Sequence, residues 1–439
     1  MGEWLDSLTG WLTLHPQWLG VAIFTIACVE CLAIAGIIVP GTVVLFAVAV
    51  LAGNGALSLS ETLLLGYSGG LLGDAISYAL GRRFHQNIRG LPLLRTHPEW
   101  LGTAESYFHR YGVASLLIGR FIGPLRPMLP MVAGMLDMPL PRFILVSLVA
   151  AAGWSVAYLL PGWATGAAFR LPLPEGFWPE AGIVAACIAL LIGLSLHATW
   201  RDRERGTQLI ALASLVMLTA LFFGFPYLDA LDNGLKTLVQ EHRSEAAEMF
   251  VVIVTRIGDF RTQFMVAALV TVLLLLTRQW RPALFACSTM LITALLNGTL
   301  KHFVARQRPD VLLEPLTTFS MPSGHSSAAF AFFLSLAVLA GRGQPSRMRL
   351  TWVLLATIPA LSIALSRVYL GAHWPTDVMA GTMLACFVCA TCLAVVQHRQ
   401  PIPAMPLRVW WLIVPACVAL LGFFAWHGLP DALARYRYM

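Results

Sequence analysis

Residues 321–341 read MPSGHSSAAFAFFLSLAVLAG, a short polar block followed at once by an apolar run without a charged residue. Such a run is typical of a helix packed within a membrane, and the polar block then lies at its N-terminal end. Backbone N–H groups at a helix N-terminus bind anions, and Gly324 allows a ligand to approach them closely. The stretch therefore predicts a membrane helix whose first turn carries an anion site.

Similar apolar runs recur along the whole chain. With 58% hydrophobic and 12% charged residues, the 439-residue chain has about half the charge that a soluble globular protein needs. Backbone amides in hydrocarbon must be satisfied within each segment, so we predict an all-α polytopic membrane protein. The long apolar runs cover residues 17–53, 143–169, 179–199, 207–226, 262–277, 283–300, 326–341, 350–365, 376–397 and 409–426.

The net charge of +7 does not indicate nucleic-acid binding, because the basic residues lie in short loops between apolar runs. In the second half these basic loops alternate along the chain, and the positive-inside rule makes their side cytoplasmic. We therefore expect residues 301–325 and 367–377 on the outer face of a bacterial inner membrane. The basic loop residues are Arg201, Arg203, Arg205, Arg278, Arg281, Arg342, Arg347, Arg349 and Arg399.

A charged segment divides the chain. Residues 198–206, ATWRDRERG, hold its densest run of charge and follow an apolar run that ends near His197. We interpret this segment as a solvated loop between two membrane domains. The predicted parts are residues 1–197, a linker at 198–206, residues 207–400, and a further span and tail at 401–439.

Three cations of the second half lie at the ends of apolar runs. Hydrolysis of a phosphate ester without a metal needs cations around the phosphoryl oxygens, a nucleophile, and an acid for the leaving oxygen. Lys301 and Arg308 are about two helical turns apart. Arg367 joins them from a distant run, and acidic partners are scarce near all three. The three cations together predict a phosphoryl-binding site.

Two histidines can supply the remaining roles. His325 lies on the first turn of the helix that follows Ser323 and Gly324, where it can protonate a leaving oxygen. His373 and Asp377 are four residues apart and share a helix face. The carboxylate can then hold the imidazole Nδ1–H and leave Nε2 free to attack phosphorus. This spacing predicts a phosphohistidine intermediate.

Together these blocks resemble the three-part signature of the type 2 phosphatidic acid phosphatase (PAP2) superfamily. The resemblance implies a six-span core within residues 207–400, with one extra span after it. It makes His325 the general acid, His373 the nucleophile and Asp377 its orienting partner, and it implies neither a metal nor another cofactor. The matching blocks are Lys301-x6-Arg308-Pro309, Pro322-Ser323-Gly324-His325 and Ser366-Arg367-x5-His373-x3-Asp377, and the implied phosphate ligands are Lys301, Arg308, Ser323, Gly324 and Arg367.

The first half carries four ionisable residues in apolar surroundings, which are functional candidates in a membrane protein. These are Glu30, Asp74, Arg120 and Arg126. The segments around them resemble the DedA family, also called the SNARE-associated or VTT domain, whose members resemble lipid scramblases and transporters with two re-entrant helices. The matching segments are Val39-Pro40-Gly41, Gly73-Asp74-x3-Tyr78-x2-Gly81-Arg82 and Gly119-Arg120-Phe121-x2-Pro124-x-Arg126.

Prolines in the first half predict broken helices. Transporters commonly build a polar site where broken helices face each other within the membrane. We expect the basic pair of this half to hold a lipid phosphate, with an acidic residue as counter-ion or proton carrier. Many family members carry an acidic residue directly after the Pro-Gly, whereas this chain has Thr42, which leaves proton coupling at that position open. The interrupting residues are Pro40, Gly41, Pro124, Pro127 and Pro130.

Three polar features lie between the runs. Residues 82–111 are too polar to span and predict an interfacial amphipathic stretch, and residues 227–248 predict a similar stretch across the outer surface. Asp259 lies near Arg256 and Arg261, and we expect it to form a local salt bridge.

The fusion favours consecutive steps on one lipid, with a phosphate removed outside and the product returned inward. Undecaprenyl diphosphate fits best, because its monophosphate product must be recycled across the bacterial inner membrane. Phosphatidate or phosphatidylglycerol phosphate is the alternative substrate. A lipid transporter whose phosphatase half only binds is the alternative of another class, and the intact His325, His373 and Asp377 favour catalysis over it. Membrane lipid phosphates and the bilayer are the expected partners, and homo-oligomerisation stays open.

Overall fold

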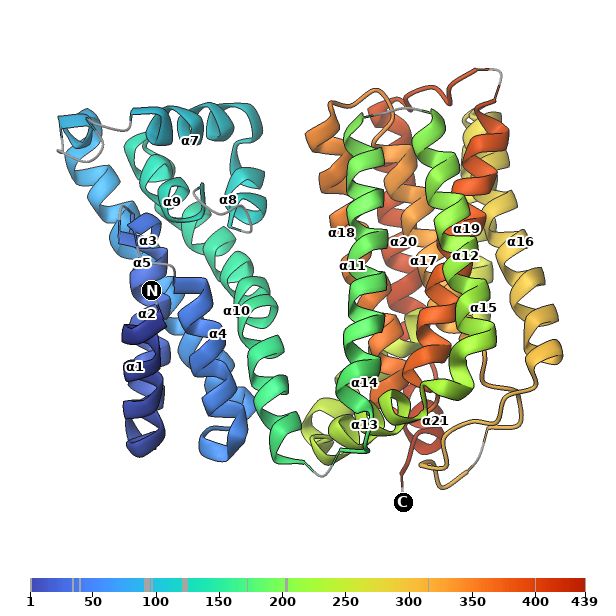
Figure 1. Cartoon of the computed structure of the whole chain (residues 1–439). Helices are drawn as coiled ribbons and strands as arrows, with labels where there is room; N and C mark the ends of the chain where they lie inside the picture. Colours follow the sequence, from blue (N-terminus) through green and yellow to red (C-terminus); the bar gives the residue numbers. More distant parts are fainter. Residues whose placement is uncertain are drawn as a thin grey trace. The chain divides into compact units, whose positions relative to one another are not determined.

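The computed structural model describes residues 2–33, 35–38, 41–90, 95, 98–120, 125–171, 173–201, 204–314, 316–398 and 400–438. Within these ranges the regular structure is helical (Figure 1), and an isolated bridge pairs Leu312 with Tyr438. Eight of the described helices are long and apolar enough to cross a membrane, and up to ten when each of two bent helix pairs counts as one span. The predicted all-α polytopic membrane fold is confirmed.

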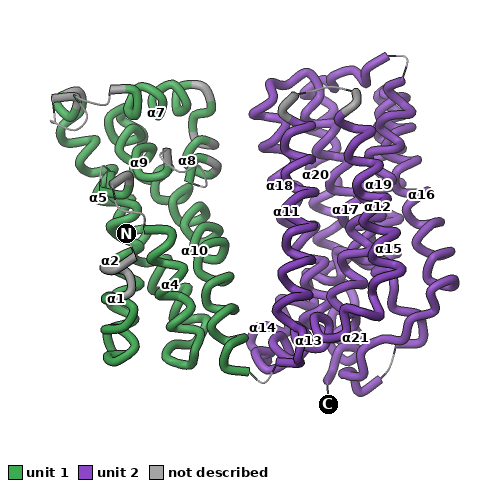
Figure 2. The backbone as a smooth tube through the Cα atoms, viewed as in Figure 1, with its two compact units in different colours: residues 1–172 green, residues 173–439 purple. Residues whose placement is uncertain are grey.

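The chain forms two compact units, residues 1–172 and 173–439 (Figure 2). The division falls before the expected joint at residues 198–206. Helix α11 (Phe177–Arg201) packs on α12 (Glu204–Gly224), α13 (Asp229–Glu241) and α18 (Ser346–Tyr369), and all of these lie in the second unit. The apolar run 179–199, which we assigned to the first domain, is therefore part of the second unit.

The first unit contains two helices that can cross a membrane alone, α5 (Leu59–Phe84) and α10 (Leu140–Arg170). The long apolar run 17–53 is divided among shorter helices. Helix α5 packs closely on α2, because a Cβ at Gly69 would lie 2.3 Å from the Phe24 carbonyl oxygen. The shorter helices are α1 (Gly2–Leu14), α2 (Leu19–Cys31), α3 (Ala35–Ile38), α4 (Gly41–Leu51), α7 (Pro98–Tyr111), α8 (Val113–Gly119) and α9 (Leu125–Met135).

Both expected helix interruptions lie near the predicted places. The first separates α2 from α4, where Val39 and Pro40 are outside the described residues. The second separates α8 from α9, where Phe121 and Pro124 are likewise outside them. Pro127 and Pro130 do not break the chain as we expected but lie inside α9. Pro127 lies in the first turn, where a missing backbone N–H leaves no intrahelical hydrogen bond unmade.

The second unit is a bundle around α17 (Gly324–Ala340) and α19 (Pro375–Val396), the more buried of which is α19. A Cβ at Gly381 of α19 would lie 2.5 Å from the Ser323 carbonyl oxygen, so glycine allows α19 to cross close to the start of α17. The expected extra span is α20. The remaining helices are α14 (Glu245–Ile257), α15 (Phe260–Leu276), α16 (Trp280–Val304), α20 (Leu407–Trp426) and α21 (Leu429–Arg435).

The two ends of this bundle differ in their loops (Figure 1). At one end, Arg349 donates to the Thr199 carbonyl and Arg281 donates to the Val396 carbonyl, so the basic loops lie together. The polar blocks at 301–325 and 366–377 meet at the other end, as the alternation of loops predicts.

Candidate active site

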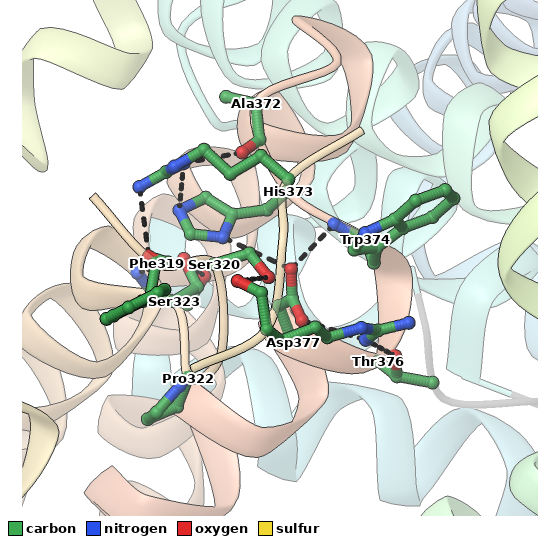
Figure 3. Close-up of polar contacts among 12 residues, drawn as sticks. Phe319, Ser320, Pro322, Ser323, Ala372, His373, Trp374, Thr376 and Asp377 are labelled. Atoms are coloured by element: carbon green, nitrogen blue, oxygen red, sulfur yellow. Dashed lines mark hydrogen bonds and ion pairs between the residues drawn. The ribbon is translucent and has the colours of Figure 1, made fainter. Parts of the chain in front are cut away.

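The turn between α18 and α19 carries His373, and Asp377 lies one helical turn further along α19 (Figure 3). The Asp377 Oδ2 atom accepts the Trp374 backbone N–H at 2.9 Å and lies 3.4 Å from His373 Nδ1. Both side chains are buried, with exposed fractions of 2% for His373 and 0% for Asp377. The predicted pair is therefore formed, and the carboxylate orients the ring from its Nδ1 side.

Arg308 occupies the other side of the imidazole. Its Nη1 lies 3.1 Å from His373 Nε2 and donates to the Ala372 carbonyl at 2.6 Å, while its Nε donates to the Thr318 carbonyl at 2.7 Å. A guanidinium can only donate hydrogen bonds, so Nε2 must accept and the ring proton must lie on Nδ1. The neighbours thus hold His373 in the tautomer whose Nε2 carries the lone pair, which accepts a hydrogen bond from Arg308 in this structure.

The local charges keep this imidazole neutral. Burial, followed by the nearby cations Arg308, Arg367 and Lys301 and then by His325, holds the pKa of His373 well below its ordinary value of 6.5. Burial and the Arg367 charge lower the pKa of Arg308 to about 10, so the guanidinium stays charged at neutral pH. A neutral nucleophile surrounded by cations suits attack on an anionic phosphoryl group.

The second predicted block lies at the start of α17. Ser323 is the N-cap of this helix, and its Oγ accepts the Ser326 backbone N–H at 3.4 Å. Its own N–H donates to the Asp377 carbonyl at 2.9 Å, which joins α17 to α19. A Cβ at Gly324 would meet the Asn297 Oδ1 only at 3.4 Å, so the helix start is open. The start of α17 therefore has the accessible backbone that the expected anion site requires.

Two further expected phosphate ligands approach from different elements. Lys301, in the last turn of α16, donates to the Phe319 carbonyl at 2.7 Å and to the Ser320 carbonyl at 3.2 Å. Arg367, near the end of α18, is 2% exposed and donates to Thr255 Oγ1 at 2.8 Å. The Arg367 carbonyl accepts the His373 backbone N–H at 3.2 Å, and Phe319 and Ser320 lie just before the block that contains Ser323.

His325 lies on the first turn of α17, and its Nε2 is 2.8 Å from Asp259 Oδ1. The expectation that Asp259 pairs locally is therefore wrong. Arg256 instead donates to the Phe424 and Gly428 carbonyls, because α20 packs on α14 and its C-terminal carbonyls face that side chain. Asp259 is therefore a second carboxylate that contacts a predicted site histidine.

Arg306 was not among the predicted site residues. It donates to Asp377 Oδ1 at 2.9 Å and to Asp232 Oδ2 at 2.7 Å, so it bridges two buried carboxylates. Asp232 also accepts the Thr376 backbone N–H at 3.0 Å. Residues 227–248 were expected to lie across the outer surface, but their helix α13 contributes Asp232 to the site. Arg306 lies within the block Lys301–Pro309, whereas the sequence around Asp232 carries no comparable signal.

A cavity of about 400 Å³ opens beside these groups. Arg306, Arg308 and the turn before His373 line it. Its volume suits a phosphate-bearing headgroup, which leaves a lipid tail to the surrounding apolar surface. Further lining residues are Thr318, Phe319, Gly371 and Ala372.

The four ionisable candidates of the first unit also come together. Arg126 pairs with Glu30, and Arg120 pairs with Asp74, with each of the four side chains at most 7% exposed. Thr42 donates to Glu30 Oε1 at 2.7 Å. The ion pairs connect α2 and α5 to the region between α8 and α9. Buried charges thus link the two interrupted regions, as expected for a polar site in a membrane. Both guanidinium groups lie against Trp154, 5.1 Å and 5.6 Å from its ring centroid.

Comparison with known proteins finds a family match for each half of the chain. Residues 39–164 match the VTT domain. The inner membrane protein YabI of Escherichia coli K12 is 40% identical over 206 residues, which cover 46% of this chain and 81% of that protein. This chain belongs to the VTT-domain family. An uncharacterized membrane protein of Buchnera aphidicola subsp. Schizaphis graminum is 35% identical over 202 residues, covering 46% of this chain and 79% of that protein.

The second unit of this VTT protein carries a further domain. Residues 282–401 match the PAP2 superfamily, so the chain is a multi-pass membrane protein that joins a VTT domain to a PAP2-type phosphatase domain. Among solved structures, a transmembrane PAP2-type phosphatidylglycerolphosphate phosphatase from Bacillus subtilis is similar, with 21% identity and a TM-score of 0.40, over 43% of this chain and 97% of that one.

Proposed function

We propose that the PAP2 domain hydrolyses a membrane lipid phosphate through a phosphohistidine at His373. The observation that carries this proposal is the position of the His373 ring, which lies between the Asp377 carboxylate at Nδ1 and the Arg308 guanidinium at Nε2. An imidazole that only packed in the core would need neither partner. This geometry presents a nucleophile to the same place where Arg308 can bind a phosphoryl oxygen.

The chemistry takes two steps. Arg308 leaves Nε2 for a phosphoryl oxygen, Nε2 attacks phosphorus, and the bond from phosphorus to the leaving oxygen breaks as His325 gives that oxygen its proton. Water then attacks the phosphohistidine, His325 takes a proton from the water, and the P–N bond breaks to release inorganic phosphate and free His373. Lys301, Arg367 and the start of α17 balance the phosphoryl charge in both transition states, so this route requires no metal.

Undecaprenyl diphosphate is the proposed substrate, and the outer face of the inner membrane is the proposed place. The positive-inside rule supports this orientation, because the basic loops lie at the opposite end of the bundle from the site. The Escherichia coli relative is named as an inner membrane protein, which supports an inner membrane location. The VTT domain would return the resulting lipid monophosphate inward, with the buried Arg120 and Arg126 as its candidate phosphate ligands.

The test is phosphate release from undecaprenyl diphosphate by the full chain in detergent with EDTA. We expect release by the wild type and its loss in His373→Ala. Release that stops in EDTA would contradict the metal-free mechanism, and release that persists in His373→Ala would contradict the nucleophile.

Substrate alternatives are separated by running the same assay with phosphatidate and phosphatidylglycerol phosphate. Release from either of these, with none from undecaprenyl diphosphate, would keep the histidine chemistry and replace the substrate. No release from any of the three, together with lipid transport in vesicles, would favour a transporter whose second unit only binds lipid phosphate.

A further inference from the structure

A short segment after α20 returns to the phosphatase site. Helix α21 (Leu429–Arg435) and the residues up to Tyr438 lie outside the part of the chain that matches the PAP2 superfamily, residues 282–401. Leu429, Ala432 and Tyr436 pack in one buried cluster with Ala372, which directly precedes the nucleophile His373. The segment therefore forms part of the wall behind the reacting groups.

Tyr436 reaches Arg367 directly. Its hydroxyl accepts a hydrogen bond from Arg367 Nη1 at 2.8 Å, and its ring centroid lies 5.2 Å from the guanidinium carbon. Tyr436 is 4% exposed and Arg367 is 2% exposed, so water does not replace these contacts in the folded protein. Thr255 holds the same Nη1 atom at 2.8 Å. With Nη1 held by two hydroxyl groups, the remaining N–H groups of Arg367 are available to a phosphoryl group.

The backbone on both sides of Tyr436 is fixed as well. Arg243 donates to the Tyr436 carbonyl at 2.7 Å and also pairs with Glu248 at 2.7 Å. The Leu313 N–H donates to the Arg437 carbonyl at 3.0 Å. Leu313 lies on the loop between Arg308 and α17. The segment therefore contacts the loop that carries Arg308 and also the side chain of Arg367.

We propose that Tyr436 is a positioning residue of the phosphatase, which holds Arg367 in the orientation that the phosphoryl transition state requires. The proposal rests on the phosphatase function proposed above and extends its machinery beyond the PAP2 signature. An arginine side chain has many rotamers. Fixing one guanidinium nitrogen limits the directions in which the other nitrogens can donate hydrogen bonds. The segment after α20 would then contribute to catalysis without touching the substrate.

The test compares Tyr436→Phe with wild type in the full chain, with the lipid phosphate that the wild type hydrolyses. Phenylalanine keeps the ring and removes the hydrogen bond to a charged group, so we expect kcat/KM to fall about tenfold. Inhibition by orthovanadate, which imitates the phosphoryl transition state, should weaken by a similar factor. The melting temperature should stay close to that of the wild type.

Tyr438→Phe is the matched control. Its ring lies over Arg243, with the guanidinium carbon 3.9 Å from the ring centroid, and phenylalanine keeps this contact, so we expect wild-type kinetics. A double-mutant cycle with Arg367→Lys adds a measurement that general packing would not affect. Once the guanidinium is absent, Tyr436→Phe should have little further effect on orthovanadate inhibition or kcat/KM.

Three results would overturn the inference. The first is a Tyr436→Phe enzyme with wild-type kcat/KM. The second is a fall in kcat/KM on Tyr436→Phe that is as large in the Arg367→Lys background as in the wild type. The third is a loss accompanied by a large fall in melting temperature and unchanged orthovanadate inhibition, which would make the role structural. A wild type that releases phosphate from no lipid would instead remove the proposed function itself, so the two failures are distinguishable.

Discussion

Asp377 has three simultaneous partners in this structure. It faces His373 Nδ1, accepts the Trp374 N–H, and pairs with Arg306. In the proposed attack, the imidazole gains positive charge as Nε2 bonds to phosphorus, and the carboxylate would stabilise that charge through Nδ1–H. The roles of His373 and Asp377 therefore both depend on the proton that lies between Nδ1 and the carboxylate.

We expect Asp377→Asn to lower kcat about 100-fold, because an amide carries no charge to stabilise the phosphorylated ring and can present its NH₂ to Nδ1. The measurement is phosphate release at saturating lipid. Glu314→Gln, at an exposed position of the loop before α17, makes the same chemical change away from the dyad and should leave kcat unchanged. A fully active Asp377→Asn enzyme would exclude the dyad.

The pH profile reports the protonation state of His373. Because its pKa is lowered from 6.5, the ring stays neutral as pH falls through the ordinary imidazole range. Activity that requires neutral Nε2 is present above the lowered pKa and is lost as pH falls through it. We expect the acid limb of the kcat/KM profile to lie below the ordinary imidazole range. An acid limb centred at or above 6.5 would argue against a neutral, buried nucleophile.

Residues with fixed spacing were predictable, and residues defined by a distant partner were not. His373 and Asp377 are four positions apart, so the sequence alone places them on one helix face. Arg306 lies inside a predicted block, but its role depends on Asp232, which is 74 positions away. Tyr436 likewise meets Arg367 across 69 positions. Such contacts arise from tertiary packing and leave no local pattern.

At the level of elements, α13 connects the surface of the bundle to its site. Its amphipathic pattern predicts a surface helix, and the exposed Asp229 in its first turn fits that prediction. Asp232, in the same turn, is 1% exposed and reaches Arg306. The helix therefore contributes a second carboxylate that shares the guanidinium charge with Asp377.

We expect Asp232→Asn to lower kcat about tenfold. Without the Asp232 charge, Arg306 would interact more strongly with Asp377 and weaken its hold on the Nδ1 proton of His373. Asp229→Asn makes the same change at an exposed position three residues earlier and should keep wild-type kcat. The comparison is phosphate release by both variants, and equal activity of the two would show that α13 does not support the dyad.

The helices show which features of the fold the apolar pattern predicts and which it does not. Apolar runs predicted the spans of the second unit, because each run must satisfy its own backbone in the membrane. The sequence does not say on which helices a span packs, and α11, which we assigned to the first domain, packs in the second unit. In the first unit, the break before α9 was predictable from its prolines, but Pro127 and Pro130 continue the helix.

For the whole molecule, the two units carry separate charged sites, and we expect their activities to separate. Arg126→Lys keeps the charge beside Glu30 but removes the planar group that lies against Trp154 and Tyr158. Lipid translocation in vesicles should fall about tenfold. Phosphate release in detergent should not change, because the variant leaves the second unit intact.

Arg142→Lys, at an exposed position of α10, is the control for that experiment and should alter neither activity. Unchanged translocation in Arg126→Lys would remove the buried pair from the transport site. A parallel fall in phosphate release would show instead that the two units act as one catalytic system.

The most direct test of the central claim is a search for phosphate on His373. The full chain is mixed with lipid diphosphate carrying ³²P in its terminal phosphate and quenched in alkali, where phosphohistidine survives. We predict label on wild-type protein that is stable to alkali, released by acid, located on the peptide containing residue 373 and absent from His373→Ala. Phosphate release without labelled protein, or equal labelling of His373→Ala, would contradict the account.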